Sequence, residues 1–558
     1  LWRQWLDQAA SADIDPPVET DFLRELARVW ACSEFVAKTC IQEPALLMEL
    51  YSSGDLARPY PSNYYDKHLA EELVDVDSDV TLGRALRRFR RREMVRIAWR
   101  DLSGKSDLDE TLEETSALAD ACIRSALNAL YPWQCGEWGT PVGEQSQSPQ
   151  SLVVLGMGKL GARELNFSSD IDLIFAYPEP GSTDAERART NEQFFLRLGQ
   201  RLIQALDERS ADGYVFRVDM RLRPYGDSGP LAMSFDGLEH YYQSQGREWE
   251  RYAMIKARVV AGDERRGAQL LELLRPFVYR RYLDYSAFES LREMKAMIVR
   301  EVQRKGLQAN VKLGSGGIRE VEFIGQAFQL IRGGRLTVLQ IRPIQQVLRL
   351  LAEQRLLPEF VAVELSDAYR FLRRVENRLQ EFADLQVHTL PDGGGERLRL
   401  AYSMGYADWI EFDSALKHHR ERVAGHFEQV FAAPQGEESD EGDEVFAGAW
   451  HDSLTAEDAQ RLLIESGFGD GAEALRLIAA LRNSSACRAL SARGRGRLDR
   501  LMPLVLGAVA GSENPDLCLP RVVGLIEAIA RRTSYLSLLI EHPMALSQLV
   551  KLMAASPW

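Results

Sequence analysis

Apolar residues recur every three or four positions through most of this chain, a period that predicts amphipathic helices packed by one face. The stretches 22–30, 82–95 and 365–382 follow this period closely. The helical pattern covers residues 1 to about 130, about 267 to 433, and 445 to 558. The chain is therefore predicted to be mostly helical, and the segment between the first two helical regions is the exception.

The segment 153–177 combines short apolar runs with closely spaced glycines. Residues 153–155 and 173–177 carry no charge and are too short to be complete helices. Between them, Gly156, Gly158 and Gly161 predict a tight turn that leads into a short helix. We predict a strand, a glycine turn, a short helix and a second strand. The fold class that follows is α+β, a mostly helical multi-domain chain with one α/β domain and helical domains before and after it.

Two acidic residues stand where the second strand begins. Asp170 and Asp172 are two positions apart, so on a strand both carboxylates leave the same face. Adjacent carboxylates repel each other unless a cation lies between them, and oxygen ligands of this kind suit Mg²⁺. The glycines upstream, Gly156 and Gly158, would let backbone N–H groups approach a phosphate. This combination predicts a metal-dependent site for nucleotidyl transfer.

Residues 214–223 alternate strictly between apolar and charged side chains, which predicts a strand with one buried and one charged face. The charged positions are Arg217, Asp219, Arg221 and Arg223. Like charges on one strand face are costly without anionic neighbours or ligands. We therefore predict Asp219 as a third metal carboxylate beside arginines that hold phosphate. A plain solvated sheet face is the alternative.

Two further basic segments have both a structural and a functional interpretation. The arginines within 87–92 are expected to form a solvated helix face, with an acidic partner surface or a phosphate contact as the alternative. The glycine-rich loop 312–323 carries Arg319 at a predicted helix start. It can be an anion-binding helix N-terminus or a turn with a capped helix.

Length and composition bound the organisation of the chain. At 558 residues it exceeds what one core supports. We predict a helical region at 1–130, the α/β domain at 131–266, a helical domain at 267–433, an acidic linker at 434–444 and a helical regulatory region at 445–558. The chain begins with Leu1 rather than Met, and we expect it to be a piece of a longer protein.

Charge and cysteine usage narrow the class of protein. The net charge of −14 argues against an enzyme that grips nucleic acid by its backbone, so no nucleic-acid partner is predicted. No pair among the six cysteines has the Cys-x-x-Cys spacing, and no apolar run approaches the ~20 residues of a membrane span. We expect reduced thiols, a cytoplasmic location and no membrane association.

The glycine pattern at 156–161 formally matches a dinucleotide-binding fingerprint, G-x-G-x-x-G. That fold places its acidic residue ~20 residues further on, beyond a full helix. Here Asp170 comes soon after Gly161 and opens the strand, and no Gly-Lys-Ser/Thr follows these glycines at the spacing of a phosphate-binding P-loop. A strand, a Gly-x-Gly turn, a short helix, Ser-Asp-x-Asp and a third aspartate on a later strand instead resemble the polymerase-β-like nucleotidyltransferases.

The resemblance extends to a narrower family. The segments 156–175, 218–224, 249–251, 255–258 and 316–323 are similar to those of the glutamine synthetase adenylyltransferase/adenylyl-removase family. Such proteins carry two nucleotidyltransferase domains, of which the N-terminal one removes AMP from a tyrosine of glutamine synthetase by phosphorolysis and the C-terminal one adds it. This chain has one Ser-Asp-Ile-Asp site, so it resembles the N-terminal half with part of the central regulatory region.

The resemblance implies a set of roles for individual residues. Asp170, Asp172 and Asp219 would bind two Mg²⁺ ions, orthophosphate would be the nucleophile and ADP the product. The implied partners are glutamine synthetase as protein substrate and the PII signalling protein in its uridylylated form. Candidates for nucleotide or phosphate contacts are Gly156, Gly158, Lys159, Ser169, Arg221, Arg223, Lys256 and Arg319.

Two other functions remain open from the sequence. The same site would serve to add AMP or UMP to a protein, because uridylyltransferases of PII share the core. A non-catalytic regulatory scaffold with a decayed site is the second alternative, which the presence of all three acids disfavours. An assay for ADP formation against AMP addition separates the enzymatic alternatives.

Overall fold

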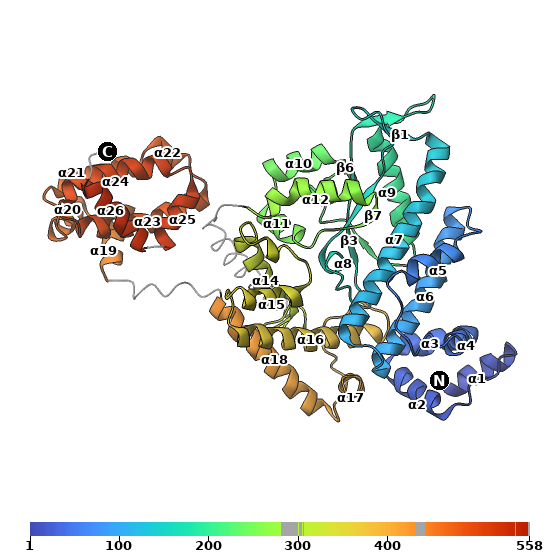
Figure 1. Cartoon of the computed structure of the whole chain (residues 1–558). Helices are drawn as coiled ribbons and strands as arrows, with labels where there is room; N and C mark the ends of the chain where they lie inside the picture. The colour runs from blue at the N-terminus through green and yellow to red at the C-terminus, as the bar shows by residue number, and fades with distance from the viewer. Residues whose placement is uncertain (281–299, 301–303, 305, 431–440, 542, 556–558) are drawn as a thin grey trace. The chain divides into compact units, whose positions relative to one another are not determined.

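The computed structural model describes residues 1–280, 300, 304, 306–430, 441–541 and 543–555 (Figure 1). These residues form two compact units, one before and one after position 428. The chain is α+β and mostly helical, as predicted. The predicted linker 434–444 lies mostly outside the described residues, and its last four residues begin helix α19 (Glu441–His451).

Two long helices dominate the N-terminal region. Helix α6 (Asp79–Ser103) begins at a capping box formed by Ser78 and Thr81 and ends at Gly104, whose φ is 78°. Helix α7 (Leu108–Trp138) follows after the Asp107 cap. The shorter helices of this region are α1 (Trp2–Ser11), α2 (Thr20–Cys32), α3 (Glu34–Gln42), α4 (Pro44–Ser52) and α5 (Tyr64–Glu72).

A five-stranded sheet lies at the centre of the first unit. Its strands are β2 (Val153–Gly156), β3 (Ile171–Tyr177), β5 (Val218–Asp219), β6 (Ala232–Ser234) and β7 (Arg258–Gly262). Strand β2 runs antiparallel to β3 and β7, whereas β5 and β6 each pair in parallel with β3. The predicted strands at 153 and 171 are confirmed. A separate pair is formed by β1 (Pro141–Gly143) and β4 (Gly181–Thr183).

Helices cover the sheet and join it to the N-terminal region. Helix α7 packs against both β7 and α9 (Asn191–Asp207), so the boundary predicted near residue 130 falls inside one continuous helix (Figure 1). One hydrophobic core runs from Trp5 to Ala261. The regions predicted as 1–130 and 131–266 therefore pack around a shared core. The other helices beside the sheet are α8 (Gly158–Gly161), α10 (Phe235–Ser244), α11 (Glu248–Met254) and α12 (Glu264–Val278).

The strand predicted over 214–223 is wrong in its extent, because only Val218–Asp219 pairs with the sheet. After Asp219 the chain turns back on itself. The guanidinium of Arg223 donates to the carbonyl of Met220 at 2.8 Å and to that of Asp227 at 3.1 Å, which closes the turn. The alternation of apolar and charged residues over 214–223 arises because single apolar side chains such as Phe216 are buried. It does not arise from continuous pairing with a neighbouring strand.

Helix α16 (Glu359–Glu381) holds the segment that leads into β3. Its Asn377 amide oxygen accepts from the N–H of Phe167 at 3.2 Å, and Gln380 accepts from that of Ser168 at 2.8 Å. The face that meets this segment is polar but fully buried. The other helices of this part of the first unit are α14 (Ile318–Arg332), α15 (Ile344–Glu353), α17 (Gly394–Ser403) and α18 (Trp409–Val430).

The second unit is helical and has its own apolar core, which includes Trp450, Leu498 and Leu506. Helix α19 packs along α23 (Ala492–Ala510). The remaining helices are α20 (Ala456–Glu465), α21 (Gly471–Arg482), α22 (Ser485–Arg488), α24 (Pro515–Ile529), α25 (Thr533–Glu541) and α26 (Pro543–Ala555). Among all described residues, no helix combines the length and apolar character needed to cross a bilayer.

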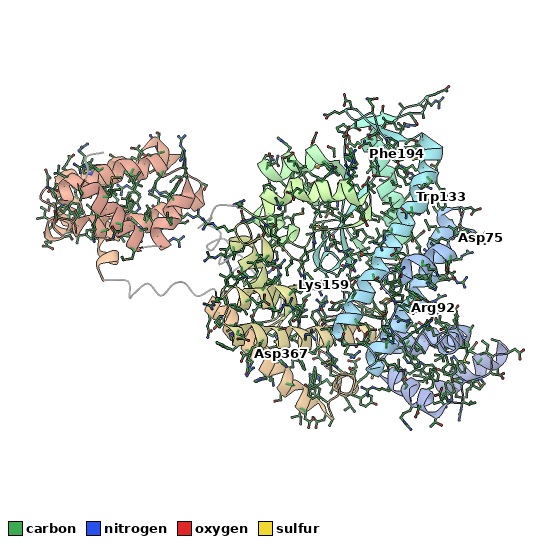
Figure 2. All side chains as sticks on the ribbon, viewed as in Figure 1. Asp75, Arg92, Trp133, Lys159, Phe194 and Asp367 are labelled. Carbon is green, nitrogen blue, oxygen red and sulfur yellow. The ribbon has the colours of Figure 1, made fainter. Side chains whose placement is uncertain are left out.

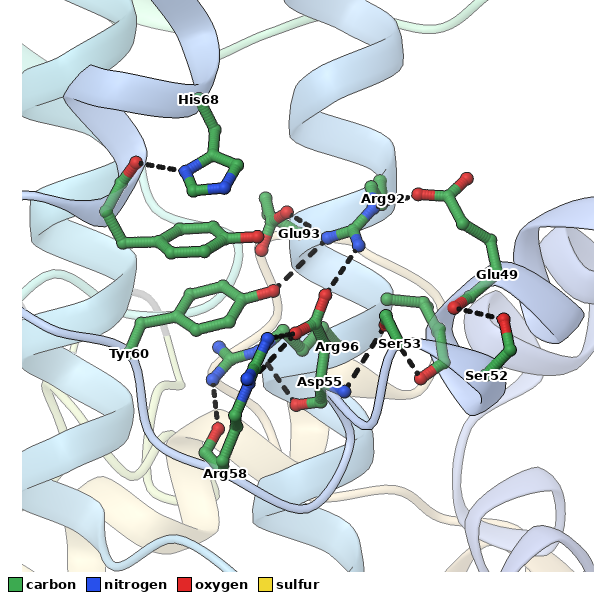
Figure 3. Close-up of polar contacts among 12 residues, drawn as sticks. Glu49, Ser52, Ser53, Asp55, Arg58, Tyr60, His68, Arg92, Glu93 and Arg96 are labelled. Carbon is green, nitrogen blue, oxygen red and sulfur yellow. Dashed lines mark hydrogen bonds and ion pairs between the residues drawn. The ribbon is translucent and has the colours of Figure 1, made fainter.

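Arg88 is exposed, but the other arginines of 87–92 do not form the solvated face expected from the sequence. Arg90 is buried and pairs with Asp384 at 2.6 Å, and Arg92 pairs with Glu49 and Asp55, each at 2.7 Å (Figure 3). The partners of Arg90 and Arg92 lie outside α6, in other segments of the chain that pack against this helix. The charges therefore act as internal cross-links between segments far apart in sequence.

Removal of the Arg90 side chain is expected to destabilise the first unit by about 3–5 kcal/mol, because Arg90→Ala leaves the Asp384 carboxylate buried and unpaired. Denaturant unfolding of the purified chain measures this change. The control is Arg24→Ala, which breaks an exposed pair with Asp21 and should cost less than about 1 kcal/mol. Equal losses in the two variants would contradict the assigned role of Arg90.

Candidate active site

Asp172 and Asp219 are direct neighbours on adjacent parallel strands. In the register of β3 and β5, Ile171 pairs with Val218 and Asp172 pairs with Asp219. The N–H of Ile171 also donates to the carbonyl of Arg217 at 2.9 Å, which fixes this register. Paired residues on neighbouring strands stand about 4.8 Å apart and point to the same face. Two carboxylates are thus held side by side at the start of β3.

The carboxylate of Asp172 faces the glycine turn that follows β2. Gly158 has a φ of 53°, and a Cβ placed there would lie 2.9 Å from Oδ2 of Asp172. The N–H of Met157 donates to the backbone carbonyl of Asp172 at 2.9 Å, which binds the turn to the strand. Within the described part of the chain, the Asp172 carboxylate has no hydrogen-bond or ion-pair partner. Glycine at position 158 therefore keeps open the space beside this carboxylate.

The surroundings of Asp172 disfavour the ionised form of its carboxyl group. Burial, then the neighbouring charges of Asp219 and Asp170, raise its pKa to about 6, although Lys312 and Arg221 oppose the shift. The charged form is therefore disfavoured in the protein as it stands. A cation between Asp172 and Asp219 would remove this penalty.

Arginines pair with the other two predicted acids. Asp219 accepts from Nε of Arg221 at 2.9 Å. Burial alone would raise the pKa of Asp219, but the pairing with Arg221 outweighs burial and lowers it. Asp170 pairs with Arg217 at 2.7 Å. Among the described residues, no three acidic, His or Cys side chains share a position suited to one metal ion. A cavity of about 580 Å³ lies over this group and is lined by Asp170, Arg217, Asp219 and Arg221 among others.

The remaining small residues of the predicted site have different surroundings. Ser169 is half-buried, and its hydroxyl has no hydrogen-bond partner within the described residues, so it is available to a ligand. Gly156 serves packing, since a Cβ there would lie 2.5 Å from a methyl group of Val260 on β7. The phosphate contact predicted for Ser169 fits this geometry better than the one predicted for Gly156.

Both predicted lysines belong to a buried ionic network rather than to the cavity. Nζ of Lys159 lies 2.9 Å from a carboxylate oxygen of Glu376 on α16, deep within the first unit (Figure 2). Burial opposes ionisation of Glu376, but Lys159 holds the pKa of Glu376 well below its usual range, whereas burial lowers the pKa of Lys159 itself to about 7. Nζ of Lys256 lies 2.8 Å from Glu322 and 3.3 Å from Glu164. The phosphate contacts of Lys159 and Lys256 remain predictions. Their pairing with glutamates away from the cavity disfavours those contacts.

The two other predicted arginines also stand apart from the acids. Arg223 closes its own turn, and Arg319 lies exposed in the first turn of α14. At the glycine loop before α14, the N–H of Gly316 donates to the Glu320 carboxylate at 2.9 Å, so the chain supplies its own anion there. This favours the capped-turn interpretation of 312–323 over an anion-binding loop.

Lys312 is a candidate that the sequence analysis did not single out. Its positive charge lowers the pKa of both Asp172 and Glu376. Within the described part of the chain, its ammonium group forms no ion pair. No periodic pattern marks this residue, and its position just before a glycine loop is the one signal in the sequence.

Two family models match the chain. The family described as glutamate-ammonia ligase adenylyltransferase matches residues 23–273, which include the sheet and all three aspartates. The family described as GlnD PII-uridylyltransferase matches residues 292–431. The two matches together cover most of the first unit.

Curated relatives align with nearly the whole chain. The relative from Nitrosococcus oceani is 57% identical over 98% of this chain, that from Thioalkalivibrio sulfidiphilus is 55% identical over 99%, and that from Pseudomonas aeruginosa is 51% identical over 99%. Each is named a bifunctional glutamine synthetase adenylyltransferase/adenylyl-removing enzyme. The chain spans 57%, 58% and 57% of their respective lengths.

Neutralising Asp172 is expected to stabilise the protein at neutral pH. The folded pKa of about 6 exceeds the unfolded value of about 3.9, so the ionised carboxylate costs stability above pH 6 and nothing below about pH 4. Asp172→Asn should gain about 1–3 kcal/mol at pH 7.5 without added metal, and the gain should vanish as the pH falls to 4. Denaturant unfolding across this range measures it.

Asp170→Asn is the matched control, because it weakens the pair with Arg217 and relieves no comparable repulsion. It should not stabilise the chain. A loss of stability in Asp172→Asn at pH 7.5, or a gain that persists at pH 4, would show that the Asp172 carboxylate is not under electrostatic strain.

Proposed function

The chain belongs to the family of bifunctional glutamine synthetase adenylyltransferase/adenylyl-removing enzymes, and on this premise we propose that it removes AMP from glutamine synthetase. The reaction is phosphorolysis of the AMP–tyrosine bond with release of ADP. In the cell this would reactivate glutamine synthetase as part of the control of nitrogen assimilation. The direct pairing of Asp172 with Asp219 beside the Gly158 turn is the observation that carries the proposal.

The residues present fit a Mg²⁺ ion at this pair. Mg²⁺ commonly takes one or two carboxylates and completes its shell with water and substrate phosphates. Asp172 offers an unpartnered carboxylate, and Asp219 would join it once Arg221 turns away. The side chain of Arg221 is 72% exposed, so it can release Asp219 without disturbing the core. Asp170 would be the third ligand if a second ion binds. Bound there, Mg²⁺ would neutralise charge on the reacting phosphates.

The chemical step needs positioning more than acid catalysis. An oxygen of orthophosphate forms a bond to the phosphorus of AMP, and the bond from that phosphorus to the tyrosyl oxygen breaks. The electron pair leaves with a phenolate, whose conjugate acid has a pKa of about 10. Arg221, the hydroxyl of Ser169 and the ammonium of Lys312 are the groups of this chain that we assign to orient the phosphates.

The direction of transfer and the regulatory partner belong to the same proposal. The relatives are named for both addition and removal of AMP, and this chain spans little more than half of their length. The match of residues 292–431 to the PII-uridylyltransferase family supports the PII protein as partner. We propose that its uridylylated form promotes removal.

Loss of either paired carboxylate should abolish the reaction. With adenylylated glutamine synthetase, Mg²⁺ and orthophosphate, Asp172→Ala and Asp219→Ala are expected to reduce ADP formation at least a thousandfold, because the phosphates lose their cation. Excess chelator should reduce ADP formation by the unmodified chain to the same degree. Chromatographic detection of ADP measures the rate.

Asp236→Ala is the control, since this acid is exposed at the start of α10 and lies outside the cavity. Its rate should equal that of the unmodified chain. Full activity in Asp172→Ala would overturn the site. Transfer of AMP from ATP to glutamine synthetase, without ADP formation from the adenylylated form, would assign the opposite direction.

A further inference from the structure

A second cavity, of about 390 Å³, lies within the first unit and is lined by none of the three aspartates. We call it the arginine cavity, because four arginines line it. Helix α2 contributes one of them and helix α16 the other three, while the turn between α6 and α7 and the end of α17 complete the wall. The arginines are Arg28, Arg370, Arg374 and Arg378.

Two of the four arginines in the cavity form no ion pair within the described residues. Arg378 pairs with Asp101 at 2.9 Å, and Arg370 pairs with Asp109 at 2.5 Å. Arg28 donates only to a neutral backbone carbonyl, at 3.1 Å, and Arg374 has no partner within the described residues. The other acid of the lining, Asp107, accepts from a backbone N–H at 2.9 Å.

Arg378, which lines the cavity, also carries an unsatisfied donor. Arg378 is 6% exposed, and its Nε–H is buried without a hydrogen-bond partner in the described structure. An orphan donor in the interior costs about 1–3 kcal/mol, more when it is charged.

We propose that the arginine cavity binds a compact multivalent anion that carries phosphate or carboxylate groups. Guanidinium groups present paired N–H donors that match both kinds of anion. The volume lies at the lower end of the range for small-molecule sites, which suits a metabolite-sized ligand rather than a protein segment. Arg28 and Arg374 would contact the anion directly at the open side of the cavity, above Arg378.

The position of the cavity on α16 indicates an effector role. Arg370, Arg374 and Arg378 recur every four residues along one side of this helix. An adjacent side of α16 holds the segment before β3, where Arg373 donates to the carbonyl of Glu164 at 2.5 Å and to the Asn166 side chain. Binding that shifts α16 would therefore act on the strand that bears Asp172. This regulatory step rests on the proposed function, whereas anion binding does not.

Calorimetric titration of the whole chain without Mg²⁺ tests the site, with inorganic phosphate, pyrophosphate and citrate as separate probes. At least one probe should bind saturably to one site. The affinity should fall at least tenfold in the double variant Arg28→Gln/Arg374→Gln, whose side chains are exposed and pair with no acid. Preference for citrate or for the two phosphates identifies the class of anion. Arg349→Gln, at an exposed site on α15, should bind as the unmodified chain does.

Two results would overturn the proposal. They are the absence of saturable binding for all three probes, and unchanged affinity in the double variant. A further variant, Asp172→Asn/Asp219→Asn, separates the two sites, because it alters the candidate active site and leaves the arginine cavity intact. If this variant alone changes the affinity, the anion binds at the active site and the arginine-cavity proposal falls, while the proposed function stands.

Discussion

The pairing of the first residues of β3 with β5 is the constraint on which the rest of the site depends. It places two carboxylates of neighbouring strands on one face, in a partly buried position where their repulsion is not screened by water. Such an arrangement costs stability and persists because the surrounding structure enforces it. The turn at Gly158 leaves open the space beside the Asp172 carboxylate, which a side chain at position 158 would otherwise fill.

A network of buried ion pairs holds the strands that carry these carboxylates in place. Lys159 in the short helix after β2 is tied to Glu376 on α16, and Lys256 before β7 is tied to Glu322 on α14. These pairs join the sheet to helices that follow it by many residues in sequence. Because each charge is buried, loss of one partner would leave the other unpaired in the interior. The sheet and the helical domain therefore act as one rigid support for the acids.

The local elements of the site could be predicted from the sequence, and their long-range partners could not. The strands around residues 153 and 171 were predicted, because period and glycine spacing are local signals. Lys159 was predicted as a phosphate ligand, since nothing near it in sequence reveals a partner 217 residues away. The arginines at 87–92 were misread for the same reason. Charge alone does not show whether a helix is packed on one side or several.

We propose that Asp172 and Asp219 together hold a divalent cation. Crystals of the chain grown with Mn²⁺ and ADP would locate the metal through its anomalous signal. We expect a peak between the two carboxylates, with Arg221 released from Asp219. Bound nucleotide without metal at this position, or metal bound only elsewhere while Arg221 keeps its pair with Asp219, would contradict it.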